Sequence, residues 1–309
     1  MKVLVLPKKN GNIICTIAIG KKYYNQWHKY CFPSWKNYCK KFSIGLIVFD
    51  KNIIDVNHKK WKKPTWQKLL IAKEIVKLYP NAKNLCYLDT DILINHLSSP
   101  NIFDFHKNNK ISLVSQINNL PYNLLKTQKK IAFYRNNFYS KKYPLDSALF
   151  MTKNQIYDFH NLKRQKDYAC MGLIMFNIKK FNDIFYNYFF LYDKKTKSLT
   201  GGDEPIMNFI LQNNHHIEWL NYKFQSLWIY EIANNYPFLY QYKNKNNNTI
   251  KKCVQNSLFN NYFLHFAGSW YESKMIKNIF KNNDLLLLKN YFNYENIKPK
   301  GRPKGIIKP

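Results

Sequence analysis

Short apolar runs alternate with longer amphipathic segments along the first third of the chain. The runs are rich in β-branched residues, which predicts buried strands. They lie at 12–19, 43–50 and 84–94. Between them, residues 23–42 and 64–80 space their apolar side chains as amphipathic helices do, and Pro33 is expected to interrupt the first helix. Strands that alternate with helices predict an α/β fold with a mostly parallel, Rossmann-like central sheet and helices on both faces.

The rest of the chain continues this mixture with longer connections. Further strands are predicted at 111–117 and 168–178, shorter strands or loops within 215–228 and 262–270, and helices at 123–139, 179–192 and 203–214. The polar and aromatic stretch 118–167 is the longest interval between two predicted strands. It is therefore the part of the domain in which an insertion is expected.

Two aspartates, Asp89 and Asp91, stand one residue apart in the sequence YLDTDILI. If the strand continues through them, its alternation places both carboxylates on one face, within reach of a single cation. Carboxylate oxygens with an incomplete ligand shell suit Mg²⁺ or Mn²⁺ bound to a diphosphate. A D-x-D pair also arises by chance at a solvated strand end, so the motif alone leaves both interpretations open.

Three further positions carry groups that could act beside such a cation. His265 follows an apolar run, and a neutral imidazole is a good Mn²⁺ ligand, although a lone histidine in that place is more often structural. Asp203 and Glu204 stand at a predicted helix start, where negative charge is favourable in itself. Lys68 lies beside Trp66 and by itself is one lysine among many.

The charge balance is strongly basic. The chain has 49 Lys and Arg against 18 Asp and Glu, a net charge of +31. Such a surface favours polyanionic partners: nucleic acid, anionic lipid headgroups or phosphorylated ligands. AT-rich codon usage would produce the same excess of lysine, so the charge has a compositional explanation as well. A hydrophobic content of 46% excludes a mainly disordered chain.

The sequence also bears on the cellular compartment. No stretch approaches the roughly 18 apolar residues that span a bilayer, and the N-terminal segment lacks the pattern of a secretion signal. The six cysteines form no C-x-x-C pair and no metal-ligand spacing. These features predict a cytoplasmic protein with free thiols, and the positive charge predicts peripheral contact with an anionic membrane.

Six segments, taken in their order along the chain, resemble the motifs of nucleotide-sugar glycosyltransferases of the GT-A fold. The resemblance is closest to the glycogenin and bacterial lipopolysaccharide galactosyltransferase family (family 8), with some likeness to Golgi mannosyl- and galactosyltransferases. The segments are TIAIGKKYY (16–24), WQKLLIAKEIV (66–76), YLDTDILI (87–94), ACMGLIMFN (169–177), GGDEPIMNFILQ (201–212) and LHFAGSW (264–270). Their common order extends the resemblance over residues 12–275.

The resemblance implies a GT-A enzyme that transfers a hexose from a UDP-sugar donor to a hydroxyl of a glycan, glycolipid or protein acceptor. It implies Mn²⁺ or Mg²⁺ as cofactor, with Asp89, Asp91 and His265 as metal ligands. The donor contacts that it implies are Ile17, Ala18, Ile19, Tyr23, Lys68, Asp89, Thr90, Gly268 and Lys274. Catalytic roles are implied for Asp203, Glu204 and Lys68.

The chain departs from the family pattern at two of these positions. The family's lysine after H-x-x-G is missing, and Lys274 is the nearest lysine. Glu204 replaces a glutamine, so a charged group can stand near the reacting carbon. Family 8 implies retention, with Glu204 as a weak nucleophile or oxocarbenium stabiliser, whereas inversion requires a carboxylate base at the acceptor hydroxyl. The sequence leaves both stereochemical outcomes open.

The expected domain organisation is simple. Residues 1–295 are expected to form a single GT-A catalytic domain, and residues 296–309 a basic mobile tail or linker. We assign the insertion 118–167 to the acceptor, because aromatic faces stack on sugar rings and basic groups attract anionic glycans. The acceptor candidates are Tyr122, Tyr134, Arg135 and Gly172. Packing into the core is an equally good explanation for each aromatic residue of the insertion.

Two other functions compete with the enzyme. The segment KGRPKG (300–305) resembles the core of a minor-groove A·T hook, which would make the chain a nucleic-acid-binding protein. Nucleic acid is the less favoured partner, because the basic residues are spread along the chain and no reader motif is present. The second competitor is an inactive glycosyltransferase-like scaffold that binds a membrane or a partner protein.

Overall fold

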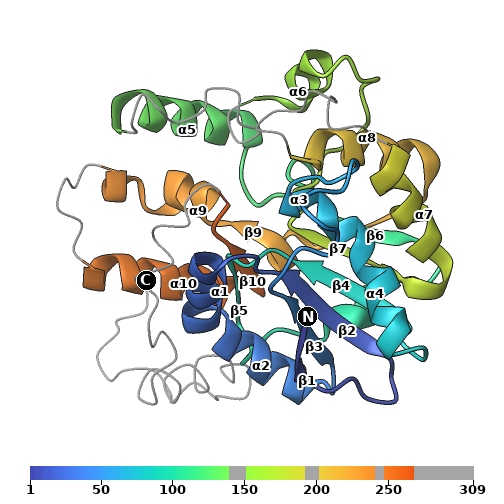
Figure 1. Cartoon of the computed structure of the whole chain (residues 1–309). Coiled ribbons are helices and arrows are strands. Elements are labelled where there is room, and N and C mark those ends of the chain that lie inside the picture. The colour runs from blue at the N-terminus through green and yellow to red at the C-terminus, as the bar shows by residue number, and fades with distance from the viewer. Residues whose placement is uncertain (139–150, 192–201, 241–246, 268–309) are drawn as a thin grey trace, which may run out of the picture. The chain divides into compact units, whose positions relative to one another are not determined.

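The computed structural model describes residues 1–138, 151–191, 202–240 and 247–267, which all belong to one compact unit, Met1–Ile276. Its centre is a seven-stranded sheet with the strand order β1-β3-β2-β4-β7-β6-β8 (Figure 1). The strands are β1 (Lys2–Val5), β2 (Asn12–Ile17), β3 (Gly45–Phe49), β4 (Asn84–Leu88), β6 (Ile111–Val114), β7 (Leu173–Asn177) and β8 (Ile217–Leu220). The expected strands are present, and β1 is an additional strand at the edge of the sheet.

The expectation of a mostly parallel sheet needs correction, because the sheet is mixed. β3, β2 and β4 are parallel to one another, as are β6 and β8. β1 runs antiparallel to β3, and β7 runs antiparallel to both β4 and β6. The helix-and-strand pattern specifies direction only where a short helical crossover joins two strands. The long connection between β6 and β7 is not bound by that rule, and it returns the chain in the opposite direction.

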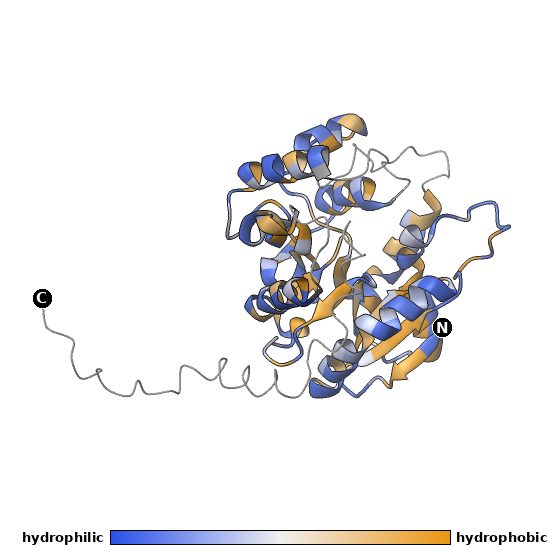
Figure 2. Ribbon diagram, turned by 90° about the vertical axis from the view of Figure 1, so that its left-hand side faces the viewer, coloured by the Kyte–Doolittle hydropathy of each residue, from blue (hydrophilic) through white to orange (hydrophobic). Residues whose placement is uncertain are grey.

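One face of the sheet is covered by four helices, as expected. Their apolar side chains, among them Ile75, Phe185 and Ile210, form a continuous core with Ile13 and Leu85 of the sheet. The covering elements are α3 (Pro64–Gln67), α4 (Ile71–Leu78), α7 (Ile178–Leu191) and α8 (Glu204–Asn214), with the 3₁₀ turn η1 (Lys68–Leu70) between α3 and α4. Figure 2 shows the strands mostly in orange and the surrounding helices in mixed blue and orange, the pattern of a sheet buried on both faces.

The opposite face is covered by α1 (Lys21–Tyr30), α2 (Phe32–Lys41) and a small second sheet. Pro33 lies in the first turn of α2, where a proline costs no hydrogen bond, so the predicted helix is interrupted before it and a second helix begins. The small sheet has the order β5-β10-β9, made of β5 (Ile92–Ile94), β10 (Phe263–His265) and β9 (Ser226–Leu227).

The predicted single strand 84–94 is wrong in one respect. β4 ends at Leu88 and β5 begins at Ile92, and the two strands belong to different sheets. Asp89 and Asp91 therefore lie in the turn between the sheets, with Ile92 N donating to Asp89 O. The turn, and not the alternation of one strand, decides how the two carboxylates face.

The insertion 118–167 contributes two helices, α5 (Leu124–Phe138) and α6 (Lys153–Phe159). α5 lies against α9 (Trp228–Asn235), and Asn234 Nδ2 donates to Thr127 Oγ1 at 2.9 Å between them. The remaining helices are α10 (Asn247–Asn260) and the 3₁₀ turns η2 (Ile102–Phe105), η4 (Tyr222–Gln225) and η5 (Pro237–Tyr240). Along the described part of the chain, every helix is too short or too polar to cross a bilayer.

A buried carboxylate joins α9 to the small sheet and to α10. Glu231 is 5% exposed and accepts hydrogen bonds from Ser226 Oγ, Asn235 Nδ2, Ser257 Oγ and Asn261 Nδ2. Four donors from β9, α9, α10 and the residue after α10 thus satisfy one side chain. Through Ser226, this network holds β9 beside β10, the strand that carries His265.

Candidate active site

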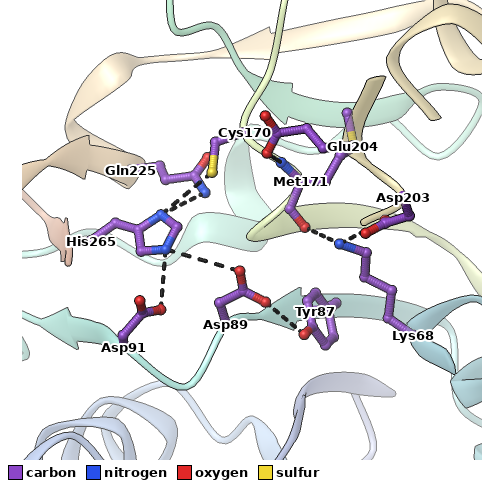
Figure 3. A network of polar contacts seen from close by, with 10 residues as sticks. All are labelled: Lys68, Tyr87, Asp89, Asp91, Cys170, Met171, Asp203, Glu204, Gln225 and His265. Carbon is purple, nitrogen blue, oxygen red and sulfur yellow. Dashed lines mark hydrogen bonds and ion pairs between the residues drawn. The ribbon is translucent and has the colours of Figure 1, made fainter. Parts of the chain in front are cut away.

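Asp89, Asp91 and His265 come together beside the turn that follows β4. β10 pairs antiparallel with β5, so His265 lies opposite Ile92, directly after the turn. His265 Nε2 is 3.1 Å from Asp91 Oδ1 and 4.0 Å from Asp89 Oδ2 (Figure 3). One ligand atom from each of the three residues lies within 4.8 Å of the others. The three residues that the sequence singled out as metal ligands are therefore adjacent.

The orientation of His265 fits a divalent cation. The amide of Gln225 satisfies its neighbours when its oxygen accepts from His265 Nδ1 at 3.2 Å and from Leu173 N at 3.1 Å, while its nitrogen donates to Cys170 O at 3.2 Å. With the proton on Nδ1, the lone pair of Nε2 faces two carboxylates. Three electron-rich groups that converge in this way require a positive charge between them. Metal-binding histidines usually have a second partner on the other ring nitrogen that fixes the tautomer, and here that partner is Gln225.

The same convergence shifts the pKa of His265. Burial alone would lower this pKa, but the Asp91 carboxylate and the Cys170 thiol outweigh burial and raise it well above the usual value. A proton on Nε2 would supply the positive charge in the absence of a cation. Proton and metal therefore compete for the same atom, as they do at histidine metal sites in general.

Gly172 leaves the space that the side chains of His265 and Asp89 occupy. A Cβ at this position would lie 2.5 Å from His265 Cε1 and 2.8 Å from Asp89 Oδ2, so at least one of these two side chains would have to move. Gly172 O also accepts a hydrogen bond from Asp89 N at 2.8 Å. The glycine thus allows the close approach of the segment before β7 to Asp89 and His265. The acceptor role of Gly172 stays a prediction.

A buried ion pair lies on the other side of this segment. Lys68 Nζ is 2.9 Å from Asp203 Oδ2, and both side chains are 4% exposed. Lys68 also donates to Met171 O at 2.7 Å. Burial opposes charge on Lys68, but the carboxylates of Asp203, Asp89 and Glu204 raise its pKa above the usual value, so the ammonium remains charged. Burial raises the pKa of Asp203, and the adjacent ammonium counteracts that rise.

Glu204 completes the group at the start of α8. Its Oε2 accepts a hydrogen bond from Met171 N at 3.3 Å (Figure 3). Among the described residues no ion pair joins Glu204 to a basic side chain, since Lys68 pairs with Asp203. Burial is the main cause that raises the pKa of Glu204 to about 7, and the charge of Asp203 adds to it. The carboxylate is therefore available in both protonation states near neutral pH.

The backbone of Met171 lies between the metal ligands and the group formed by Lys68, Asp203 and Glu204. Its N–H donates to Glu204 and its carbonyl accepts from Lys68, while the next residue contacts the metal ligands. Gln225 and Tyr87 also belong to this network, because Tyr87 OH donates to Asp89 Oδ1 at 2.7 Å. Sequence reasoning missed Gln225 and Tyr87 as site residues. A lone glutamine in an irregular region has no recognisable pattern. Tyr87 lies in β4, two residues before Asp89, so the alternation of the predicted strand could have indicated it.

Five of the predicted donor contacts lie at the carboxyl ends of the neighbouring parallel strands β2 and β4: Ile17, Ala18, Ile19, Asp89 and Thr90. Ile17 ends β2, Ala18 and Ile19 follow it, and Ala18 N donates to Phe49 O at 2.8 Å. Tyr23 is 53% exposed on α1, so its ring is free to contact a ligand. Thr90 lies between the two aspartates of the turn. Their contacts with a donor remain predictions. Gly268 and Lys274 lie outside the described residues, as does the segment 296–309.

The predicted acceptor residues of the insertion pack partly into the core. Tyr122 meets Tyr230 edge-on, with ring centroids 5.9 Å apart, and Tyr134 packs against the same cluster around Ile131. Arg135 lies in α5, and its side chain is outside the described part of the chain. Packing against this cluster therefore accounts for part of the surface of Tyr122 and Tyr134. Their role in acceptor binding stays a prediction.

Comparison with known proteins supports the fold. No protein-family model matches the chain, and no curated protein sequence matches it significantly. Among solved structures, the chain is similar to a glycosyltransferase involved in the glycosylation of the major capsid of PBCV-1, with a TM-score of 0.50 and 10% identity over 85% of this chain and 98% of that one.

Two further glycosyltransferase structures are similar at lower scores. They are the bifunctional enzyme WbbM (TM-score 0.47, 13% identity, 93% of this chain and 51% of that one) and the galactosyltransferase LgtC with donor and acceptor sugar analogues (0.46, 12%, 90% and 95%). At such identities a likeness concerns the fold. The chain has the GT-A glycosyltransferase fold.

Proposed function

We propose that this chain is a metal-dependent glycosyltransferase that moves a hexose from a UDP-sugar to a hydroxyl of a glycan, glycolipid or protein acceptor, with retention at the anomeric carbon. The observation that supports it best is the convergence of two sets of side chains on the segment 170–172. One set consists of three ligands for a divalent cation, and the other of Lys68, Asp203 and Glu204.

The metal ligands would act on the donor diphosphate. Asp89, Asp91 and His265 would hold Mn²⁺ or Mg²⁺, which, when bound, supplies a Lewis acid that offsets the charge developing on the leaving diphosphate. Gln225 keeps His265 in the tautomer that such binding needs, and Tyr87 orients Asp89. Hard oxygen ligands with one imidazole suit these ions better than softer metals.

The second set would act on the sugar. Lys68 holds Asp203 in place and anchors the Met171 peptide, so the positions of both carboxylates are fixed before a substrate arrives. In the reaction, the anomeric C–O bond to UDP would break with its electron pair going to the diphosphate, a bond to the acceptor oxygen would form, and the acceptor hydroxyl proton would pass to the leaving diphosphate oxygen. Glu204 has no cationic partner among the described residues, so its ionised form can stabilise positive charge at the anomeric carbon.

The deciding experiment is a donor screen. Release of UDP or GDP from a panel of nucleotide sugars is measured with Mn²⁺ for the wild-type chain and for Asp91→Ala. We expect UDP release by the wild type, loss of at least about 100-fold in the variant, and an unchanged circular dichroism spectrum, because Asp91 is partly exposed in a turn. Undiminished activity of Asp91→Ala would overturn the metal assignment.

Two further measurements on the wild type would favour the competing functions. If the wild type releases no nucleotide and UDP with Mn²⁺ does not raise its melting temperature, an inactive scaffold is favoured. If it binds DNA tightly at physiological salt, a nucleic-acid-binding function is favoured. Co-sedimentation with vesicles, with and without anionic lipid, tests the proposed peripheral membrane contact.

A further inference from the structure

An open cavity of about 540 Å³ lies at the sheet edge formed by β8, away from the metal ligands. Its walls come from the loop after β6, the segment before Tyr168, the end of α8 and the first residues of β8. The residues that matter for its chemistry are Asn118, Asn119, Gln165, Asp167, His216 and Trp219. This volume is within the range of small-molecule sites.

The wall of the cavity is held rigidly by a network around Asp167. Asp167 Oδ1 accepts from Ser115 Oγ at 2.5 Å, and Oδ2 accepts from Asn118 Nδ2 at 2.6 Å. Gln212 of α8 clamps the main chain of the same residue: its Oε1 accepts from Asp167 N at 3.1 Å and its Nε2 donates to Asp167 O at 2.9 Å. A ligand would therefore meet a wall whose order does not depend on binding.

Several polar groups of the cavity remain available to a ligand. In the described part of the chain, no hydrogen bond uses the side chains of Asn119 or His216, and Asn118 Oδ1 accepts none. Amides and imidazoles both donate and accept, so together they match vicinal hydroxyl groups, each of which also does both. Trp219 is half-buried beside them and offers an apolar surface of the kind on which sugar rings pack.

Other ligand classes fit less well. A buried carboxylate in the wall disfavours an anion such as a nucleotide, even though Lys166 lines the rim. A peptide would need apolar pockets for its side chains, whereas the apolar lining consists of Ile217 and Trp219 alone among the described residues. A neutral oligosaccharide satisfies both the amides and the indole.

From this lining we infer that the cavity is a binding site for a neutral oligosaccharide, remote from the site of transfer. The cavity and the transfer site share two elements. α8 carries Glu204 at its start and Gln212 about two turns and 12 Å further along its axis, and the segment that includes Asp167 continues to Gly172. The assignment of the bound glycan to a distal part of the acceptor rests on the proposed function.

Binding is tested without turnover, on a microarray of neutral linear oligosaccharides and unglycosylated peptides, with the full chain. The variant is Asn119→Gly/His216→Ala. Glycine tolerates the φ of 60° at position 119, and His216 is exposed, so neither change should disturb folding. The matched control is Asn213→Ala, an exposed residue of α8 that does not line the cavity. Melting temperatures of all three proteins check folding.

We expect the wild type and Asn213→Ala to retain the same oligosaccharides, and the double variant to bind them about 10-fold more weakly, the effect of losing one or two hydrogen bonds. Retention of no oligosaccharide, retention of peptides only, or equal binding by the double variant would each overturn the inference. UDP release, measured in parallel on the wild type, separates the two claims. Glycan binding without nucleotide release would contradict the proposed function and leave the binding site standing.

Discussion

The Lys68 ammonium and the Asp203 carboxylate form an ion pair that is almost completely buried, with Nζ 2.9 Å from Oδ2. Lys68 begins the 3₁₀ turn η1, and Asp203 is the residue before α8, so the pair joins two elements on the same face of the sheet. Its third partner, Met171 O, belongs to the segment that contacts the metal ligands. The pair therefore connects the folding of two helices to the geometry of the site.

Breaking this pair should destabilise the protein strongly. Lys68→Met leaves the Asp203 carboxylate buried without its partner, and we expect a loss of about 3 kcal/mol in the free energy of unfolding. Replacing both partners, in Lys68→Met/Asp203→Leu, should recover part of that loss because no buried charge remains. Urea unfolding measures both values. The control is Lys77→Met, which removes an exposed pair with Glu74 and should cost about 0–1 kcal/mol. Equal costs for the two single variants would contradict the assignment.

Adding one methyl group at Gly172 should abolish metal binding. The Cβ in Gly172→Ala would collide with His265 Cε1 and Asp89 Oδ2, so the ligands must separate. We expect the rise in melting temperature caused by Mn²⁺ and UDP to disappear. Gly11→Ala is the matched control, because its Cβ would be crowded by Lys83 Cγ at 2.8 Å in a turn remote from the site. This control should lose stability and keep the response to Mn²⁺ and UDP.

The raised pKa of Glu204 predicts how stability changes with pH. The folded chain holds this proton up to about pH 7, and the unfolded chain loses it near 4.5. Between these values the folded state binds more protons, so its stability falls as pH rises. Glu204→Gln does not titrate, and we expect it to gain about 2 kcal/mol over the wild type between about pH 5 and pH 8.

Chemical denaturation across that pH range measures the gain of Glu204→Gln. Glu74→Gln is the control, because it removes a half-buried carboxylate of α4 that is paired with Lys77, and it should change the stability by no more than about 0–1 kcal/mol. A constant difference between Glu204→Gln and the wild type would show that the burial of Glu204 does not disfavour its charged form.

The Glu231 network should be sensitive to the replacement of one carboxylate oxygen by an amide nitrogen. Glu231→Gln keeps the shape of the side chain, but its amide nitrogen cannot accept from the donors that surround the carboxylate. We expect a loss of about 2 kcal/mol in unfolding free energy. Glu218→Gln is the comparison, since its carboxylate lies near the surface between Lys107 and Lys110 and should cost about 0–1 kcal/mol. A Glu231→Gln variant as stable as Glu218→Gln would show that the network is replaceable.

Local pattern was sufficient for most of the elements. The apolar runs around Ile14 and Leu46 are strands, the helix begins at Pro64, and Pro33 separates two helices, as predicted. These features depend on residues that are close in sequence, because helical and strand periodicity follow from the backbone itself. The sequence also indicated Asp89, Asp91 and His265, which the fold brings together.

Tertiary structure alone decided the features that join distant segments. These features depend on which segments become neighbours in the folded chain. They are the direction of β7, the turn that holds Asp89 and Asp91, the role of Gln225, and the backbone of Met171 as a link between Lys68 and Glu204. No local period encodes such contacts, since a buried polar group has to find its partners wherever the packed chain places them. The residue types of the site were therefore visible in the sequence, and its geometry was determined by the packing of the two sheets and α8.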